Sequence, residues 1–273
     1  MLCANSAKVG LPFQMPFRRH VRFLLDRVVL QLRHRYVQSL AGHFWAFIHP
    51  LILVGIFWLV FSRVMPTRIA VGGSQQGYVY FLISGFFAWQ CISETISTGC
   101  TTLRGNADII RRLPIPVPLF FIEAVLIAAT GLIVSMPLVL IVVAAAGLGP
   151  SLTWLLVLPT LLLLLLLATA LGMVLGLVNV FFRDVELFLP ALLQLLLWTA
   201  PIVYPPEAIG EAYRWLLALN PFSSGIILLR EQILYAAPGS LSHWLVGAGW
   251  CLVLLSLAGM LYYRVRDDLR DNL

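Results

Sequence analysis

Charged side chains are scarce in this chain, and their scarcity excludes an ordinary soluble domain. Only 11% of the 273 residues are charged, 60% are hydrophobic, and the mean hydropathy is +0.94. A soluble globular domain carries about 25% charged residues. We therefore predict an all-α polytopic membrane protein, in which nearly the whole length is needed for membrane spans.

Lysine is almost absent, which excludes ATP hydrolysis through a phosphate-binding loop. The one lysine is Lys8, and Val9 follows it, whereas that loop needs a lysine placed directly after a glycine. The five histidines are scattered along the sequence, and no nucleophilic side chain is paired with a base at a recognisable catalytic spacing. The sequence thus predicts no enzyme, no metal site and no cofactor bound by this chain. The +6 charge is carried by arginines and indicates membrane topology rather than nucleic-acid binding.

Cysteines and acids inside the apolar runs are also few. None of the four cysteines lies in a predicted external loop, so we expect apolar packing and no disulfides (Cys3, Cys91, Cys100 and Cys251). A proton-coupled transporter usually needs several acids within its spans. Glu94 in the second run and His49 in the first are the ionisable candidates, and the sequence leaves their roles open.

Six apolar runs are predicted to cross the membrane, at about 41–61, 78–99, 119–146, 152–182, 185–204 and 241–263. Residues 1–40 precede them as a cytosolic segment, and residues 264–273 form a cytosolic tail. The first 17 residues have no apolar core, so no cleavable signal peptide is expected. In the fourth run, Ala168, Gly172 and Gly176 form a row of small residues that favours close packing within the chain over dimerisation.

Residues 18–38 have the pattern of an amphipathic helix. The apolar residues fall on one helical face (Val21, Leu24, Leu25, Val28, Leu32 and Tyr36). Charged residues fall on the opposite face (Arg19, Arg22, Asp26 and Arg33). The pattern predicts a helix on the membrane surface, acting either as a plain anchor or as an anchor that also holds a cytosolic partner.

A short charged island, residues 103–118, separates the second and third spans. Its charged residues would each cost about 3 kcal/mol in hydrocarbon, so the island must lie outside the bilayer. They are Arg104, Asp108, Arg111 and Arg112. A second, smaller island, formed by Arg183, Asp184 and Glu186, precedes the fifth span.

The first island also carries the signals of a short helix. Asn106 can cap its first turn, Asp108 lies at the positive end, and Arg111 and Arg112 lie at the negative end. Three prolines then stop it. Taken alone, the stretch fits either a connecting loop or a rigid contact helix offered to a cytosolic partner.

Residues 205–240 are neither a span nor an ordinary loop. Residues 208–219 and 222–235 resemble two helices broken at Asn220-Pro221, and each is shorter than the roughly 20 residues that cross a bilayer. We expect two half-inserted helices on the outer side. With six spans and a cytosolic N-terminus, 14 basic residues lie inside and four outside, which favours this orientation and places the first island in the cytosol.

Four segments, in this order, resemble the permease subunit of bacterial ABC-type polysaccharide exporters, a family within the type 2 ABC exporters. The first runs from Arg35-Tyr36 through Ser39, Gly42 and Trp45 to Pro50, with Ala41 where the family more often has leucine. The others are residues 106–116, then Phe182-Arg183-Asp184, and finally Pro201-Ile-Val-Tyr204-Pro205 followed by Leu219-Asn220-Pro221-Phe222 and Arg230.

The resemblance implies a homodimer of this chain with two copies of a separate ATPase that binds ATP and magnesium. Residues 106–113 would dock in the ATPase, and the two spans at 41–61 and 185–204 would line the conduit. The implied ATPase-coupling residues are Asn106, Asp108, Ile109, Arg111, Arg112, Arg183 and Asp184. The implied outer gate comprises Pro201, Tyr204, Asn220, Pro221 and Arg230.

Aromatic side chains are candidates for the conduit lining, because sugars present apolar C–H faces to flat rings. The candidates are Phe44, Trp45, Phe57, Trp58, Trp198 and Tyr204. The alternative is that they face lipid, pack inside the bundle or form an interfacial belt.

We therefore predict the permease of an ATP-driven exporter of lipid-linked polysaccharide in the bacterial inner membrane. A drug or small-lipid exporter of the same superfamily is the second reading. A membrane scaffold or a secondary transporter without an ATPase is the third.

Overall fold

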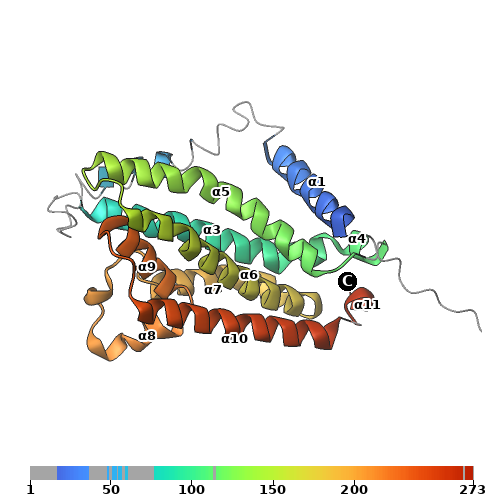
Figure 1. The fold of residues 1–273 in the computed structure, drawn as a ribbon. Helices are drawn as coiled ribbons and strands as arrows, with labels where there is room; N and C mark the ends of the chain where they lie inside the picture. Colours follow the sequence, from blue (N-terminus) through green and yellow to red (C-terminus); the bar gives the residue numbers. More distant parts are fainter. Residues whose placement is uncertain are drawn as a thin grey trace, which may run out of the picture.

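A computed structural model describes residues 17–36, 48, 51–53, 55–56, 59–60, 77–112, 115–266 and 268–272. Within these ranges every regular element is a helix. Long helices run side by side along one direction, and shorter ones gather at the two ends of the bundle (Figure 1). The predicted all-α class is confirmed for the described part of the chain.

Four described helices are long and apolar enough to cross a membrane. They are α3 (Gly77–Gly105), α5 (Pro118–Ala145), α6 (Val157–Phe181) with the preceding turn η3 (Leu152–Leu156), and α10 (Leu241–Val265). They match the predicted second, third, fourth and sixth spans. In α3, 72% of the most apolar stretch is buried, against 17% in α10. Helix α3 is therefore the centre of the bundle, and α10 lies at its edge.

Close packing of α3 against α6 depends on glycines. A Cβ atom on Gly176 would lie 2.5 Å from the carbonyl oxygen of Gly99, and one on Gly172 would lie 3.3 Å from the carbonyl oxygen of Thr95. The small residues of α6 thus serve packing within the chain, as the sequence favours. Such contact lets two backbones meet without intervening side chains.

The other two predicted spans differ in outcome. Most of the first, at 41–61, lies outside the described residues. Where the fifth was expected at 185–204, helix α7 (Asp184–Thr199) has 16 residues, which at 1.5 Å per residue is about 24 Å. The helix ends earlier than predicted because Ala200, which precedes Pro201, takes an extended conformation.

One end of the bundle, here called the α9 end, holds the broken helices. Helix α9 (Ser223–Leu234) agrees with the second expected half-helix. The first expected half-helix, 208–219, is wrong: the chain forms η4 (Pro206–Ala208), η5 (Glu211–Tyr213) and the five-residue α8 (Trp215–Leu219). The extended backbone of Gly210 separates the turns and prevents one continuous helix.

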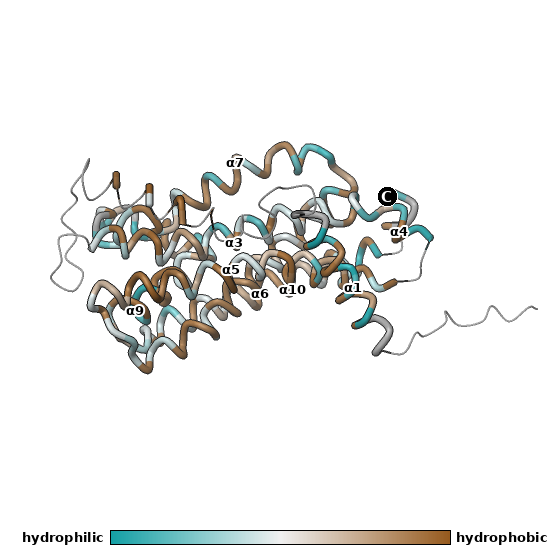
Figure 2. Tube along the Cα trace, turned by 90° about the horizontal axis from the view of Figure 1, so that it is seen from above, coloured by the Kyte–Doolittle hydropathy of each residue, from teal (hydrophilic) through white to brown (hydrophobic). Residues whose placement is uncertain are grey.

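The opposite end, here called the α4 end, gathers α1 (Phe17–Tyr36), α4 (Ala107–Arg112), α11 (Leu269–Asn272) and the C-terminus. Figure 2 shows hydrophilic residues on α1 and α4, while hydrophobic residues dominate the long helices. The two charged islands of the sequence therefore lie at one end of the bundle, as an arrangement outside the bilayer requires.

We predict that Gly176→Ala lowers the thermal stability of the purified protein. The added methyl group would press against the Gly99 backbone and force α3 and α6 apart. The matched control is Gly259→Ala in α10, where a Cβ atom meets no atom within 4 Å and alanine favours the helix. Heating in detergent followed by size-exclusion chromatography measures both variants. Equal unfolding temperatures would contradict the close contact.

Candidate functional site

Helix α4 has one apolar face that packs on the bundle and one charged face that is exposed. Ile110 is 1% exposed and belongs to a cluster with Leu103, Phe120 and Leu177, while Ile109 packs half-buried beside it. Further members of this cluster include Ile115, Val117, Phe121, Val180 and Leu269. Burial of Ile110 fixes how the helix is rotated, so its charged face points away from the bundle.

The exposed face carries three of the sequence-predicted site residues. Asp108, Arg111 and Arg112 are all exposed, with the acid in the first turn and the two arginines in the last. This order suits the helix dipole. The predicted short helix is thus confirmed, and its geometry is that of a surface able to contact a partner.

Asn106 has a different role from the one expected. Its backbone oxygen accepts hydrogen bonds from the N–H groups of Ile109 and Ile110, both at 3.0 Å. Its side-chain amide donates to the carbonyl oxygen of Thr102 at 2.8 Å, and its side-chain oxygen accepts from Arg27. The expectation that the Asn106 side chain caps α4 is therefore wrong, because that side chain is turned toward α1 and α3.

Arg27 is the residue that joins three elements at the α4 end. Its Nε donates to both carboxylate oxygens of Glu123, at 3.0 and 2.9 Å, and its Nη2 donates to Asn106. Glu123 is 3% exposed. The guanidinium also lies 5.3 Å from the ring centre of Phe120 and 5.7 Å from that of Phe23. Helix α1 is thus held against the start of α5 and the junction between α3 and α4.

Sequence reasoning missed this pair. Neither Arg27 nor Glu123 is among the site residues that the sequence predicts. One signal was available: Arg27 directly precedes Val28 of the apolar face, and a charge at the border of such a face needs a partner. A cavity of about 220 Å³ lies beside the pair, between α1, α3 and α5, and Gln31, Thr98 and Thr101 are among its lining residues.

The second charged island lies at the same end. Arg183, in the turn between α6 and α7, and Asp184, the first residue of α7, are both exposed. The next acid, Glu186, has its carboxylate 4.0 Å from the guanidinium of Arg104 at the end of α3. The α6–α7 turn and the segment that carries α4 are thereby linked.

At the α9 end, Arg230 proves to be a buried structural residue. It is 3% exposed, although the sequence counted it among the external charges and the outer gate. It donates hydrogen bonds to the carbonyl oxygens of Phe81 at 3.2 Å, Ile202 at 2.6 Å, and Pro201. The absence of a side chain at Gly85 leaves room for it, since a Cβ there would lie 2.9 Å from the guanidinium.

Asn220 closes the same region from the other side. Its side-chain amide donates to the carbonyl oxygen of Leu196 at 2.8 Å and to the hydroxyl of Thr199 at 2.9 Å. Its side-chain oxygen accepts from the N–H of Phe222 at 2.9 Å. Asn220 thus binds the last turn of α7 and Arg230 binds the segment that follows it, while the half-buried Pro221 lies in the turn before α9.

The conduit candidates are only partly described. Trp198 is 54% exposed, and the hydroxyl of the partly exposed Tyr204 donates to its carbonyl oxygen. Phe44, Trp45, Phe57 and Trp58 lie outside the described residues. On α7, Leu187, Phe188 and Leu195 are exposed beside Trp198, so this helix presents a broad apolar surface.

The family model and the similar proteins found by comparison agree on one transporter family. The family model described as ABC-2 type transporter matches residues 19–234. An O-antigen export system permease protein, RfbA, of Klebsiella pneumoniae is 27% identical over 222 residues, which are 80% of this chain and 83% of that protein.

Two further relatives are similar over most of their length. RfbA of Myxococcus xanthus, also an O-antigen export system permease protein, is 29% identical over 74% of this chain and 76% of its own length. The polysialic acid transport protein KpsM of Escherichia coli is 26% identical over 87% of this chain and 91% of its own length. The residues that the family model matches include both α4 and α9.

We predict that Arg27→Ala destabilises the protein by about 3–5 kcal/mol, because it leaves the carboxylate of Glu123 buried without its cation. Arg27→Ala combined with Glu123→Gln should recover much of that loss. The matched control is Arg214→Ala, which breaks an exposed pair with Glu211 and should cost less than about 1 kcal/mol. Denaturant unfolding in detergent measures all three, and equal losses for the two single variants would contradict a buried pair.

Proposed function

Because the chain belongs to the ABC-2 type transporter family, we propose that it is the permease subunit of an ATP-driven exporter that moves a lipid-linked polysaccharide across the inner membrane. The observation that carries the proposal is similarity over most of the chain to permeases of O-antigen export and to a polysialic acid transport protein. These relatives favour polysaccharide over a drug or a small lipid as cargo. ATP hydrolysis is assigned to a separate subunit, because the chain has no phosphate-binding loop.

The membrane arrangement that supports this function has six spans with both termini in the cytosol. Four described helices supply the second, third, fourth and sixth spans. The run at 41–61 supplies the first, and α7 with the irregular segment after it supplies the fifth. Helix α1 lies along the cytosolic surface of the membrane, where its arginines meet anionic headgroups.

Helix α4 and the α6–α7 turn form the surface for the ATPase. Asp108, Arg111 and Arg112 are exposed on α4, and Arg183 and Asp184 are exposed at the same end of the bundle. Ile110 and the Asn106–Arg27 contact hold α4 firmly to the bundle, so a force applied to α4 is delivered to α1, α3 and α5. This is the mechanical requirement for coupling nucleotide binding in one subunit to opening in another.

A homodimer places the conduit between two copies of this chain. The apolar surface of α7, with Trp198, is exposed in the single chain and would lie on the dimer axis together with the span at 41–61. The end of α7, held by Asn220, and the segment after it, held by Arg230, would form the outer gate with Pro201, Tyr204 and Pro221. The aromatic candidates would offer flat faces to the sugars.

We predict that native mass measurement of the complex, extracted from its own membranes in mild detergent, gives two permease chains and two copies of an ATPase. The family supplies the expectation of an ATPase partner, and an apolar α7 surface that needs covering supports the dimer. A chain that emerges alone, even when nucleotide is added to stabilise the complex, would contradict an ATPase-driven exporter and favour a secondary transporter or a scaffold.

We predict that reversing both α4 arginines, Arg111→Glu with Arg112→Glu, abolishes export and leaves the protein folded. Both side chains are exposed, so the fold loses little, while repulsion would weaken docking on the ATPase. Complementation of a deletion strain measures surface polysaccharide and the lipid-linked glycan that accumulates inside. The control is Arg264→Glu with Arg266→Glu, exposed at the same end on and just after α10. Wild-type export by the α4 variant would overturn the docking role.

A further inference from the structure

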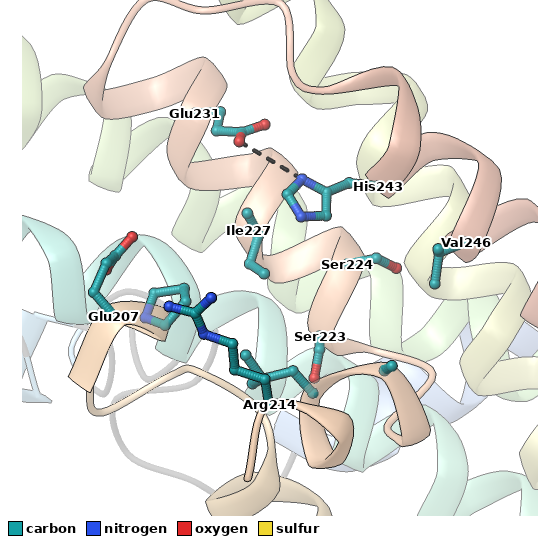
Figure 3. A pocket seen from close by; sticks show the side chains of 11 residues that line it. Glu207, Arg214, Ser223, Ser224, Ile227, Glu231, His243 and Val246 are labelled. Atoms are coloured by element: carbon teal, nitrogen blue, oxygen red, sulfur yellow. Dashed lines mark ion pairs between the residues drawn. The ribbon is translucent and has the colours of Figure 1, made fainter. Parts of the chain in front are cut away.

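A cavity of about 480 Å³ opens at the α9 end, and Arg230 is not among its lining residues. Its walls come from the turns before α8, from α8 itself, and from the facing sides of α9 and α10 (Figure 3). The volume lies within the range of roughly 300–1,000 Å³ that small-molecule sites occupy. None of the sequence-predicted site residues lines it.

Two serine hydroxyls in this cavity have no partner within the described part of the chain. Ser223 is 1% exposed and Ser224 is 4% exposed, and each hydroxyl oxygen is fully buried without a hydrogen bond. Figure 3 shows Ser224 directed toward the α10 side, near Val246, and Ser223 on the side of Arg214. A hydroxyl buried without a hydrogen bond is unfavourable, so these two groups favour a ligand that supplies the missing partners.

A third unsatisfied group comes from α10. The Nδ1 atom of His243 is buried and lies 3.6 Å from a carboxylate oxygen of Glu231, which is longer than a hydrogen bond. The other carboxylate oxygen of Glu231 accepts from the backbone N–H of Ser240 at 3.0 Å, which fixes the carboxylate in place. One oxygen and one ring nitrogen are thus held next to each other without a direct hydrogen bond between them.

The remaining lining residues of the cavity are either aliphatic or charged. Leu217, Ala218, Ile227 and Val246 supply aliphatic surface, and Glu207 and Arg214 also line the cavity. The polar groups can both donate and accept, and the aliphatic groups can cover C–H bonds. This combination matches a ligand with several hydroxyl groups on a compact ring.

We propose that this cavity is a binding site for a neutral sugar residue, one site in each copy of the chain. The hydroxyls of Ser223 and Ser224, the carboxylate of Glu231 and the imidazole of His243 would bind the hydroxyls of the sugar. That the sugar belongs to the exported glycan rests on the proposed function. The cavity would then hold part of the glycan at the end of the permease where it emerges.

Charge disfavours a phosphate-bearing ligand here. Two carboxylates, Glu207 and Glu231, line the cavity, and the one arginine, Arg214, is also 3.8 Å from Glu211. A phosphate group would face more negative than positive neighbours, while a neutral polyol is not repelled. A phospholipid headgroup is therefore the weaker candidate.

The test compares saccharide binding by the purified full-length protein and its Ser223→Ala, Ser224→Ala double variant. The probes are short oligosaccharides released from the total surface polysaccharide of the cells, and calorimetry measures binding in detergent. We expect the wild type to bind and the variant to bind about tenfold more weakly, since two hydrogen bonds are removed. The variant should fold at least as stably, because it loses two unpaired buried hydroxyls. The control is Ser135→Ala, a buried serine that does not line the cavity.

Any other outcome contradicts the proposal that the cavity binds a sugar. Equal binding by the variant and the wild type, or no binding by either, removes the sugar site. A stability gain that depends on phosphatidylethanolamine nanodiscs and is lost in the variant would assign the cavity to a lipid headgroup instead. The proposed function is tested separately by gene deletion: unchanged surface polysaccharide after deletion contradicts export, whereas the binding result concerns only the cavity.

Discussion

The constraint on which the α9 end depends is the need to pair backbone carbonyls where the chain leaves a helix close to the bilayer. In hydrocarbon no water can bind such groups, so another part of the protein must. Arg230 does this for Pro201 and Ile202, and the hydroxyl of Tyr78 does it for Val203 at 2.7 Å. Without these donors, the carbonyls of the segment after α7 would have to find their partners in water.

The identity of the donor matters, because a planar guanidinium has five N–H groups in a fixed fork. Arg230 uses three nitrogen atoms on three carbonyls and lies with its guanidinium 3.4 Å from the ring centre of Phe81. A lysine could not reach the same three acceptors from one position. The fold therefore places a costly buried charge where several carbonyl dipoles and an aromatic face stabilise it.

The α4 end uses a second arginine in a different way. Arg27 neutralises a buried acid and also reaches Asn106, so α1, the start of α5 and the junction before α4 share one cation. The two ends are connected by α3, whose residues include Phe81 near its start and Thr102 near its end. Close contact with α6 at Gly99 gives α3 little freedom to bend, so we expect it to move as one body.

The sequence predicted those elements whose signals lie within the element itself. Hydropathy and length identified α3, α5, α6 and α10, and the charges around Arg111 with the following prolines identified α4. The ends of α7 and the turns at 206–219 were harder, because conformations at Ala200 and Gly210 decide them.

Tertiary pairing was not readable from sequence at all. Arg27 and Glu123 are 96 residues apart, and Gln232 pairs with Thr160 inside the bundle across 72 residues. An isolated polar residue in an apolar run indicates that it has a hydrogen-bond or ion-pair partner. Only the fold identifies the partner residue. The same limit explains Arg230: its charge and its position near an external loop favour exposure, while two carbonyls of the irregular segment after α7 and one of α3 make burial the more stable choice.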